Sequence, residues 1–243
     1  MKSKISIAVL LLIAIVLAFG EVVAPALAES TVAHRITAKT GSQDVMVQFS
    51  STPRCLMLLG QIDHVHAVVH QGRLGEVLVS ELALDGSDVR LDMPALVNSE
   101  DVQVKSAGEL KLTGIVTEDN LKELLTRKAD KLENAEVSIT PDGVTIQANV
   151  KVFGRMADAE LTGTVVDDSG ELLFHMTSLS ISNAPFGKAS LGSLFGDIPL
   201  VGRGKMPFGL RVTDTKMQAG KVVITATYDA SAGSSDVLAP YYE

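Results

Sequence analysis

Three histidines in the stretch HVHAVVH have the spacing most typical of a metal site in this chain. His64, His66 and His70 stand at even intervals, so a β-strand would place all three on one face. A His-x-His pair on a strand can chelate zinc. The third histidine would lie about 13 Å from His66 along an extended strand, too far to complete a site without a bend. We therefore predict exposed polar side chains here, with no metal and no cofactor.

Other motifs that could support catalysis fail at specific positions. Residues 187–192 (GKASLG) do not have the Gly-x-Ser-x-Gly spacing of a nucleophile elbow. The pair Gly204-Lys205 is followed by Met206, and Pro199 stands where a phosphate-binding loop needs its first glycine. The carboxylates are scattered over predicted turns. The sequence predicts a protein that is not an enzyme, without catalytic residues.

The beginning of the chain has the anatomy of a secretory signal peptide. Lys2 and Lys4 precede an apolar run over residues 5–19, and Ala26-Leu27-Ala28 gives a small-x-small cleavage pattern. The run is shorter than the roughly 20 residues that span a bilayer, although an uncleaved N-terminal anchor is the alternative. We expect export to the periplasm or cell envelope, with residues 1–28 removed and Glu29 as the first mature residue.

Composition restricts the partners and the core. The formal charge is -8, and such an acidic chain repels phosphate backbones, so no nucleic-acid partner is expected. Cys55 is the single cysteine, which excludes an intramolecular disulfide. The chain has no Trp and only 4% aromatic residues. The core must therefore be aliphatic.

Alternation with a period of two dominates the chain and predicts β-strands. In residues 144–152 every even position is apolar and every odd position is polar. Pro141-Asp142-Gly143 supplies turn chemistry before it, with a left-handed Gly143, so residues 137–152 are expected to form a hairpin. Further strands are expected at residues 45–49, 77–84, 89–91, 102–104, 110–115, 161–166, 172–181, 210–212 and 222–228, with turns at Asp85-Gly86, Ala107-Gly108, Asp168–Gly170 and Ala219-Gly220.

One amphipathic helix interrupts this pattern. Thr117 is a good N-cap and Glu118 and Asp119 place negative charge in the first turn, while Asn120 in place of Glu leaves the capping box incomplete. The apolar stripe consists of Leu121, Leu124, Leu125, Ala129 and Leu132. It predicts a helix of roughly 15 residues, or ~22 Å.

The fold class that follows is α+β, with a long curved antiparallel sheet wrapped around this one helix. The stripe and the apolar strand face either form an ordinary filled core or leave an apolar space between them. For the second case, the candidate lining residues are Leu121, Leu124, Leu125, Leu132, Val144, Ile146, Ala148, Val150, Val152, Leu172, Phe174 and Met176.

Residues 183–209 are rich in glycine and proline yet apolar, and carry Phe186, Leu194 and Phe195. A loop this long is uncommon in a compact domain and is often functional. It suits a cavity lid or a tip that touches a membrane, and these three residues join the candidate lipid-binding set. The alternative is a short helix over residues 189–195 that packs on the sheet edge.

Several stretches resemble the LmeA-like phospholipid-binding family of bacterial envelope proteins. They are TEDNLKELL, ITPDGVTIQANVKVFG, IPLVGRGKMPFGLRV and KVVITATYD, with LLGQIDHV and VLVSELALDGSDVRLD upstream, and together they cover residues 55–229. The resemblance implies an extracytoplasmic protein with a tubular lipid-binding (TULIP-like) architecture, in which a curved sheet and a long helix enclose acyl chains. It implies no catalytic residue.

Two functions remain open. The first is a lipid-binding or lipid-transfer protein, partnered by a phospholipid or another acyl lipid and by a membrane surface. The second is a structural or protein-interaction module with a filled core. In either case the expected organisation is a signal peptide (1–28), a lead-in (29–43), an α+β domain (44–230) and a loose C-terminal tail (231–243).

Overall fold

The computed structural model describes residues 29–38, 40–74, 77–98, 103–128, 132–152, 155–168, 170–182, 189–190, 197–201 and 206–228. These residues belong to two compact units. Unit 1 holds the described residues up to Val68 together with Leu84–Leu110, and unit 2 holds Val69–Ala83 and the described residues from Lys111 onward.

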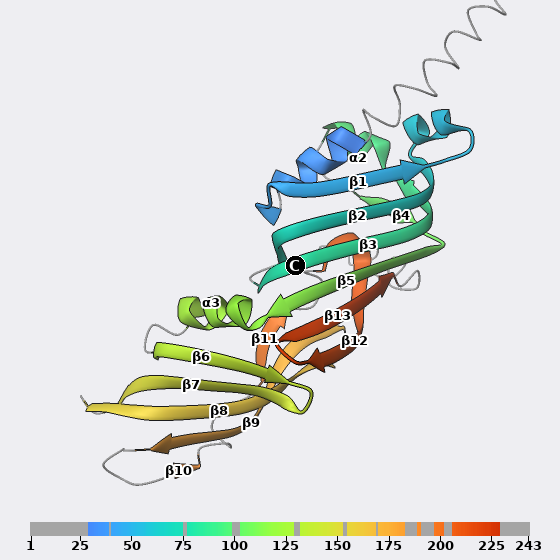
Figure 1. Cartoon of the computed structure of the whole chain (residues 1–243). Coiled ribbons are helices and arrows are strands. Elements are labelled where there is room, and N and C mark those ends of the chain that lie inside the picture. Colours follow the sequence, from blue (N-terminus) through green and yellow to red (C-terminus); the bar gives the residue numbers. More distant parts are fainter. Residues whose placement is uncertain are drawn as a thin grey trace, which may run out of the picture. The chain divides into compact units, whose positions relative to one another are not determined.

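Unit 1 contains a helix over residues 29–38, which lies on an apolar sheet face (Figure 1). Val32 of this helix is buried with Val47 and Ala67, and Phe49 and Leu84 pack against them. Glu29 links this helix to the sheet, because its Oε1 accepts a hydrogen bond from the Phe49 N–H at 2.9 Å. The other elements are β1 (Asp44–Ser50), the 3-10 helix η1 (Arg54–Leu59), α2 (Met93–Asn98), β4 (Val104–Ser106) and the adjoining parts of β2 (Gln61–Leu74) and β3 (Val77–Leu91).

Unit 2 contains the remaining parts of β2 and β3, the helix α3 and a series of hairpins. Its elements are β5 (Glu109–Thr117, from Lys111), α3 (Glu118–Lys128), β6 (Leu132–Thr140), β7 (Gly143–Val152), β8 (Arg155–Asp168), β9 (Glu171–Ser182), β10 (Ala189–Ser190), β11 (Ile198–Val201), the 3-10 turn η2 (Pro207–Gly209), β12 (Leu210–Gln218) and β13 (Lys221–Tyr228). The helix α3 packs against the edge strand β6 (Figure 1).

The strands form two sheets. One has the order β1-β2-β3-β5-β13-β12 with β4 beside β3, and the other has the order β10-β9-β8-β7-β6 with β11 beside β9. The registers that define the second sheet are antiparallel, which confirms the antiparallel character predicted from the alternation. The prediction of a single sheet around a single helix is not confirmed, because the described residues also form helices at 29–38 and Met93–Asn98.

The predicted turn at Asp85-Gly86 is wrong, since β3 runs unbroken from Val77 to Leu91. Gly86 serves close packing instead. A Cβ atom there would lie 2.6 Å from Leu110 Cδ1 and 2.9 Å from Val65 Cγ1. A glycine within a strand pattern can mark a close approach as well as a turn, and here the neighbouring side chains occupy the space.

The predicted turns at Gly170 and Gly220 are present, but the backbone conformation of Gly143 differs from the prediction. Gly170 and Gly220 have φ of 85° and 77° at their turns. Gly143 does not adopt the predicted left-handed conformation and lies within β7. Its missing side chain matters for another reason, because a Cβ would lie 3.0 Å from the Gly163 carbonyl oxygen.

The helix is shorter than its apolar stripe predicted. The structure ends α3 at Lys128, and Leu132 begins β6 opposite Val150 of β7. The prediction that Leu132 continues the helical stripe is therefore wrong. Ala129 lies outside the described residues. A leucine fits a helical stripe and a strand face equally well, so spacing alone did not separate these two states.

Candidate functional site

The helix α3 is fixed at its beginning by a complete reciprocal cap. The Asn120 N–H lies 3.4 Å from Thr117 Oγ1, and Asn120 Oδ1 accepts from the Thr117 N–H at 3.1 Å and from its hydroxyl at 2.9 Å. The prediction of an incomplete capping box is thus wrong. The shorter Asn side chain takes the role that Glu or Gln usually has at this position.

The backbone of a single β6 residue, Ile139, joins three elements of unit 2. The Ile139 N–H donates to Glu118 Oε1 of α3 at 2.7 Å, and the Ile139 carbonyl accepts from the Gly220 N–H at 2.9 Å. Gly220 lies in the turn between β12 and β13. The first turn of α3 and the β12–β13 hairpin therefore meet at one end of the second sheet, and Leu121 and Leu124 of α3 are buried.

The strand register shows which side chains share the apolar face of this sheet. The face, called the inner face below, consists of cross-strand rows in which each member is the direct partner of the next. Starting from β7, the rows are Val144–Gly163–Met176, Ile146–Leu161–Leu179, Ala148–Ala159–Ile181 and Val150–Ala157, and β9 adds Phe174 opposite Val165 and Leu172 opposite Asp167.

Packing is tight at one end of the inner face. Val144 has an exposed fraction of 0%, and Leu172 and Phe174 are almost as fully buried. At Gly163 a Cβ would lie 2.5 Å from Phe174 Cζ, so the ring fills the space of the missing side chain. The β12–β13 hairpin reaches this end, because Gly220 bonds Ile139 and a Cβ on Gly170 would touch Arg211 of β12.

Packing loosens along the same face toward the rows of Ile146 and Ala148. Ala148 is buried with an exposed fraction of 8%, and Leu161, Ala159 and Val150 are only half-buried, although Ile146 and Ala157 in these rows are buried at 4% and 3%. The side chains also become small, since Ala148 is the direct partner of Ala159 and the next row contains Ala157. Small side chains leave volume above a sheet that large ones would fill. This half, called the loose rows below, comprises the rows of Ile146, Ala148 and Val150.

A β-bulge decides which residues of β9 belong to the loose rows. The register shifts between Thr162 and Gly163, so that Thr177 and Ser178 both stand opposite Thr162. Thr162 Oγ1 lies 3.2 Å from Thr177 Oγ1 and 2.7 Å from Ser178 Oγ. Beyond this extra residue, Leu179 and Ile181 are the inward positions. Sequence reasoning missed both, because strict alternation from Met176 turns them outward.

The predicted lining residues have different outcomes. Eight are buried in unit 2, and Val150 is half-buried in the loose rows. The buried ones are Leu121, Leu124, Val144, Ile146, Ala148, Leu172, Phe174 and Met176. The side chains of Leu125, Leu132 and Val152, and the whole of Phe186, Leu194 and Phe195, lie outside the described residues. The role of all these residues in lipid binding stays a prediction.

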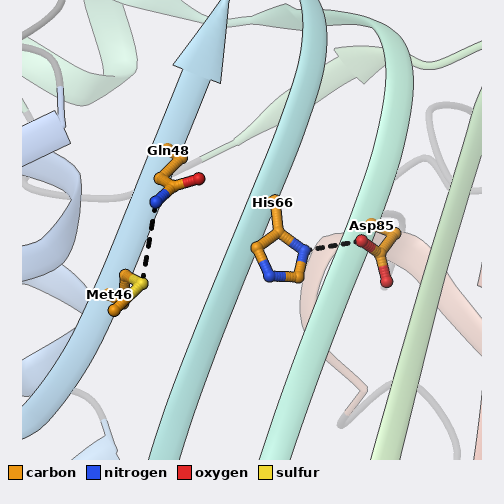
Figure 2. Close-up of polar contacts among 4 residues, drawn as sticks. All are labelled: Met46, Gln48, His66 and Asp85. Carbon is orange, nitrogen blue, oxygen red and sulfur yellow. Dashed lines mark hydrogen bonds and ion pairs between the residues drawn. The ribbon is translucent and has the colours of Figure 1, made fainter.

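The three histidines lie exposed on β2, as predicted. His66 Nδ1 is hydrogen-bonded to Asp85 Oδ1 on β3 at 2.7 Å, and Figure 2 shows this contact beside the one between Gln48 and Met46 on β1. His70 Nε2 lies 3.7 Å from Glu81 Oε2. Exposed cross-strand pairs of this kind keep a sheet face polar. Among the described residues no three His, Cys, Asp or Glu side chains cluster as metal ligands would.

The fold and the apolar inner face together define the structural class of the protein. This is a mainly antiparallel β protein in which an amphipathic helix packs beside an apolar sheet face. The family model for LmeA-like phospholipid-binding proteins matches residues 19–227, and the chain belongs to this family. The resemblance seen in the sequence is thus confirmed. Comparison with curated proteins and with solved structures finds no match.

Membership gives the general activity, which is binding of phospholipid. In the described part of the chain, no helix is both long and apolar enough to cross a bilayer.

Proposed function

We propose that this protein is an extracytoplasmic phospholipid carrier that shields acyl chains against the loose rows of its inner face. The family supplies the ligand class. The graded packing of unit 2 carries the choice of site, because the same sheet face is close-packed around Val144 and has small or half-buried side chains around Ala148. An acyl chain needs an apolar surface that the protein does not already cover completely.

The energetics suit a carrier. Burying one methylene contributes about 0.8 kcal/mol, so a diacyl lipid with on the order of 30 methylenes gains roughly 24 kcal/mol on leaving water. A bilayer offers nearly the same gain. Exchange between membrane and protein is then close to balanced, which permits both loading and release.

A second candidate is a non-enzymatic interaction module with a filled core. The observation that favours it is the close packing at the other end of the inner face, where Leu172 and Val144 have exposed fractions of 1% and 0%. If the whole face behaved like this end, no room for an acyl chain would remain. The two candidates therefore differ in what the rows around Ala148 do.

Ala148→Phe separates the two candidates. Under the carrier proposal the larger ring occupies the space of the acyl chain, so the amount of co-purified phospholipid falls and transfer between labelled vesicles slows, while the melting temperature changes little. Mass spectrometry of organic extracts measures the first effect. In a filled core the same change overpacks the site and lowers the free energy of unfolding by about 1 to 3 kcal/mol.

Two control variants on the same strand sharpen this test. Gln147→Phe places the ring on the exposed outer face and should alter neither lipid loading nor, beyond its hydrogen bond to Glu160, stability. Val144→Phe places it in the close-packed rows and should destabilise the protein. Unchanged lipid in Ala148→Phe together with a marked loss of stability would reject the carrier proposal.

The extracytoplasmic location rests on the N-terminal sequence pattern. Cleavage after Ala28 would make Glu29 the first residue of the mature chain. Intact-mass measurement of protein from an envelope fraction should therefore give a chain that begins at Glu29. A chain that begins at Met1 and resists a salt wash would establish an anchored form instead.

A further inference from the structure

One hydroxyl group of unit 2 is closed to solvent and has no hydrogen-bond partner among the described residues. Its oxygen is the Oγ1 atom of Thr215 on β12. The residue as a whole is half-buried, so other parts of Thr215 reach solvent while this oxygen does not. A buried polar atom without a partner is costly, and folded proteins pair almost all such atoms. The unpaired hydroxyl therefore calls for a physical explanation.

A β-bulge turns this hydroxyl toward the apolar side of the sheet. The register of β12 against β13 shifts just before Asp214. Thr215 consequently stands opposite Ile224, whereas a regular ladder would place Asp214 there. Direct partners in an antiparallel pair point to the same side of the sheet, and Ile224 is buried. The bulge thus puts a neutral donor at the inner position, while the carboxylate of Asp214 pairs with Lys216 at 2.7 Å.

The neighbours of Thr215 on this side of the sheet are apolar. Its own row across β12, β13 and β5 continues with Ile224 and Gly114. The two adjoining rows are Val212–Ala226–Leu112 and Met217–Val222–Val116. All members of the adjoining rows are buried except Met217, which is half-buried. The three rows therefore offer Thr215 no side-chain oxygen as an acceptor.

The row of Thr215 also has room at its glycine. Gly114 is buried, yet a Cβ atom there would meet a single atom within 4 Å, Leu82 Cδ2 at 3.3 Å. At Gly163, in the close-packed end of the inner face, a Cβ would lie 2.5 Å from two atoms. A donor without an acceptor and a space without a side chain thus lie on one row of unit 2. The strand β12 lies against β8 and β9, which carry parts of the inner face.

We propose that the Thr215 hydroxyl donates a hydrogen bond to an ester carbonyl of the bound phospholipid and thereby positions the lipid. The ligand class is that of the family, and the inference rests on the proposed function. In a diacyl phospholipid, the ester carbonyls lie between the apolar chains and the charged headgroup. Thr215 lies at a matching boundary, because the residue reaches solvent and its oxygen faces apolar side chains. From there the acyl chains extend toward the loose rows.

The chemistry of the three rows favours an ester over a phosphate or a water molecule. An anion would lose its hydration among apolar side chains, and these rows contain no cation to compensate. A buried water molecule typically makes about three hydrogen bonds, whereas the side chains of these rows supply one hydroxyl. An ester carbonyl needs only one donor and brings its own apolar chains. It therefore fits this position best.

Competition between two lipids tests this hydrogen bond in the full-length protein. Vesicles contain equal amounts of dipalmitoyl phosphatidylglycerol and its dihexadecyl ether analogue, which has the same headgroup and chain length but no ester carbonyl. After incubation the protein is separated from the vesicles, and mass spectrometry gives the ratio of the two bound lipids. We expect the unchanged protein to prefer the ester lipid about fivefold over the vesicle ratio, which is the factor that one hydrogen bond contributes.

Thr215→Val removes the hydroxyl and keeps the shape of the side chain. The ester preference should fall to about one, while the ether lipid stays bound. After detergent removes all lipid, the melting temperature of the variant should not fall, because the hydroxyl loses no partner within the protein. Thr213→Val is the matched control, since its exposed hydroxyl donates to the Thr225 carbonyl at 3.4 Å. This control should keep the full ester preference.

The outcomes separate this inference from the proposed function. If both lipids bind, an absent ester preference in the unchanged protein, or a preference that survives in Thr215→Val, would refute the hydrogen bond and leave the carrier intact. An equal loss of preference in Thr213→Val would also refute it, as would a clear fall in the melting temperature of lipid-free Thr215→Val. Failure of the unchanged protein to bind either lipid would refute the carrier as well.

Discussion

The two units treat an apolar sheet face in different ways. In unit 1 the chain covers its own sheet, because Val32 of the helix over residues 29–38 packs onto Val47 and Ala67. In unit 2 the inner face is closely covered at one end, whereas the other end combines small side chains with the half-buried Leu161, Ala159 and Val150. Each face satisfies the same need to remove apolar surface from water. Under the proposed function, the difference is that the loose rows leave part of this task to a ligand.

The largest loss of stability is expected from a variant that disrupts the close-packed end of unit 2. Gly163→Ala adds a Cβ atom that would lie 2.5 Å from the His175 carbonyl oxygen and from the Phe174 ring. Because one of these atoms belongs to the backbone, relief requires a shift of β9, and we expect the free energy of unfolding to fall by about 3 kcal/mol. Urea denaturation measures this change.

Gly114→Ala on β5 is the matched control for that prediction. Its Cβ would meet only the end of the Leu82 side chain, at 3.3 Å, and that side chain can move. The control should therefore be much less destabilising. Equal effects in the two variants would show that Gly163 is not in a close-packed region.

A smaller effect should come from uncovering the sheet of unit 1. Val32→Ala removes two methyl groups from a buried contact, and we expect a loss of about 2 kcal/mol. Co-purified lipid should stay at the level of the unchanged protein, because a covered face has no place for an acyl chain. Loss of lipid without loss of stability in this variant would reverse the roles assigned to the two faces.

The smallest effect is expected on the polar face of β2. Replacing His64, His66 and His70 together by Gln should change the free energy of unfolding by no more than about 0.5 kcal/mol. The contacts to Asp85 and Glu81 join exposed groups, which contribute little. Zinc retained at one equivalent per chain after dialysis, and lost in the triple variant, would contradict this prediction.

Alternation and turn chemistry predicted much of the fold. The stretch from Val144 to Val152 became β7, and Gly170 and Gly220 became hairpin turns, because these signals are local. Asp85-Gly86 was misread as a turn, since only tertiary contacts reveal that Leu110 and Val65 crowd Gly86. The helix over residues 29–38 was not predicted, because four of its ten residues are the β-branched Thr31, Val32, Ile36 and Thr37, which have low helix propensity.

The candidate site was predictable where one strand was enough to define it. Val144, Ile146 and Ala148 were assigned to one face from β7 alone. Ala157, Ala159, Leu179 and Ile181 were not, since their facing depends on the register of neighbouring strands and on a bulge.

The bulge at Thr177 affects the curvature of β9 without changing which of its side chains lie on the inner face. Deleting this residue would give β9 a regular ladder against β8, yet Met176, Leu179 and Ile181 would keep their inward positions, because the extra residue stands on the outer side. Bulges bend a strand and increase its local twist. A one-residue deletion would therefore flatten the sheet beneath the proposed lipid site without replacing any side chain of the inner face. The width available to a ligand and the chemistry of its surroundings are thus set by different parts of this strand.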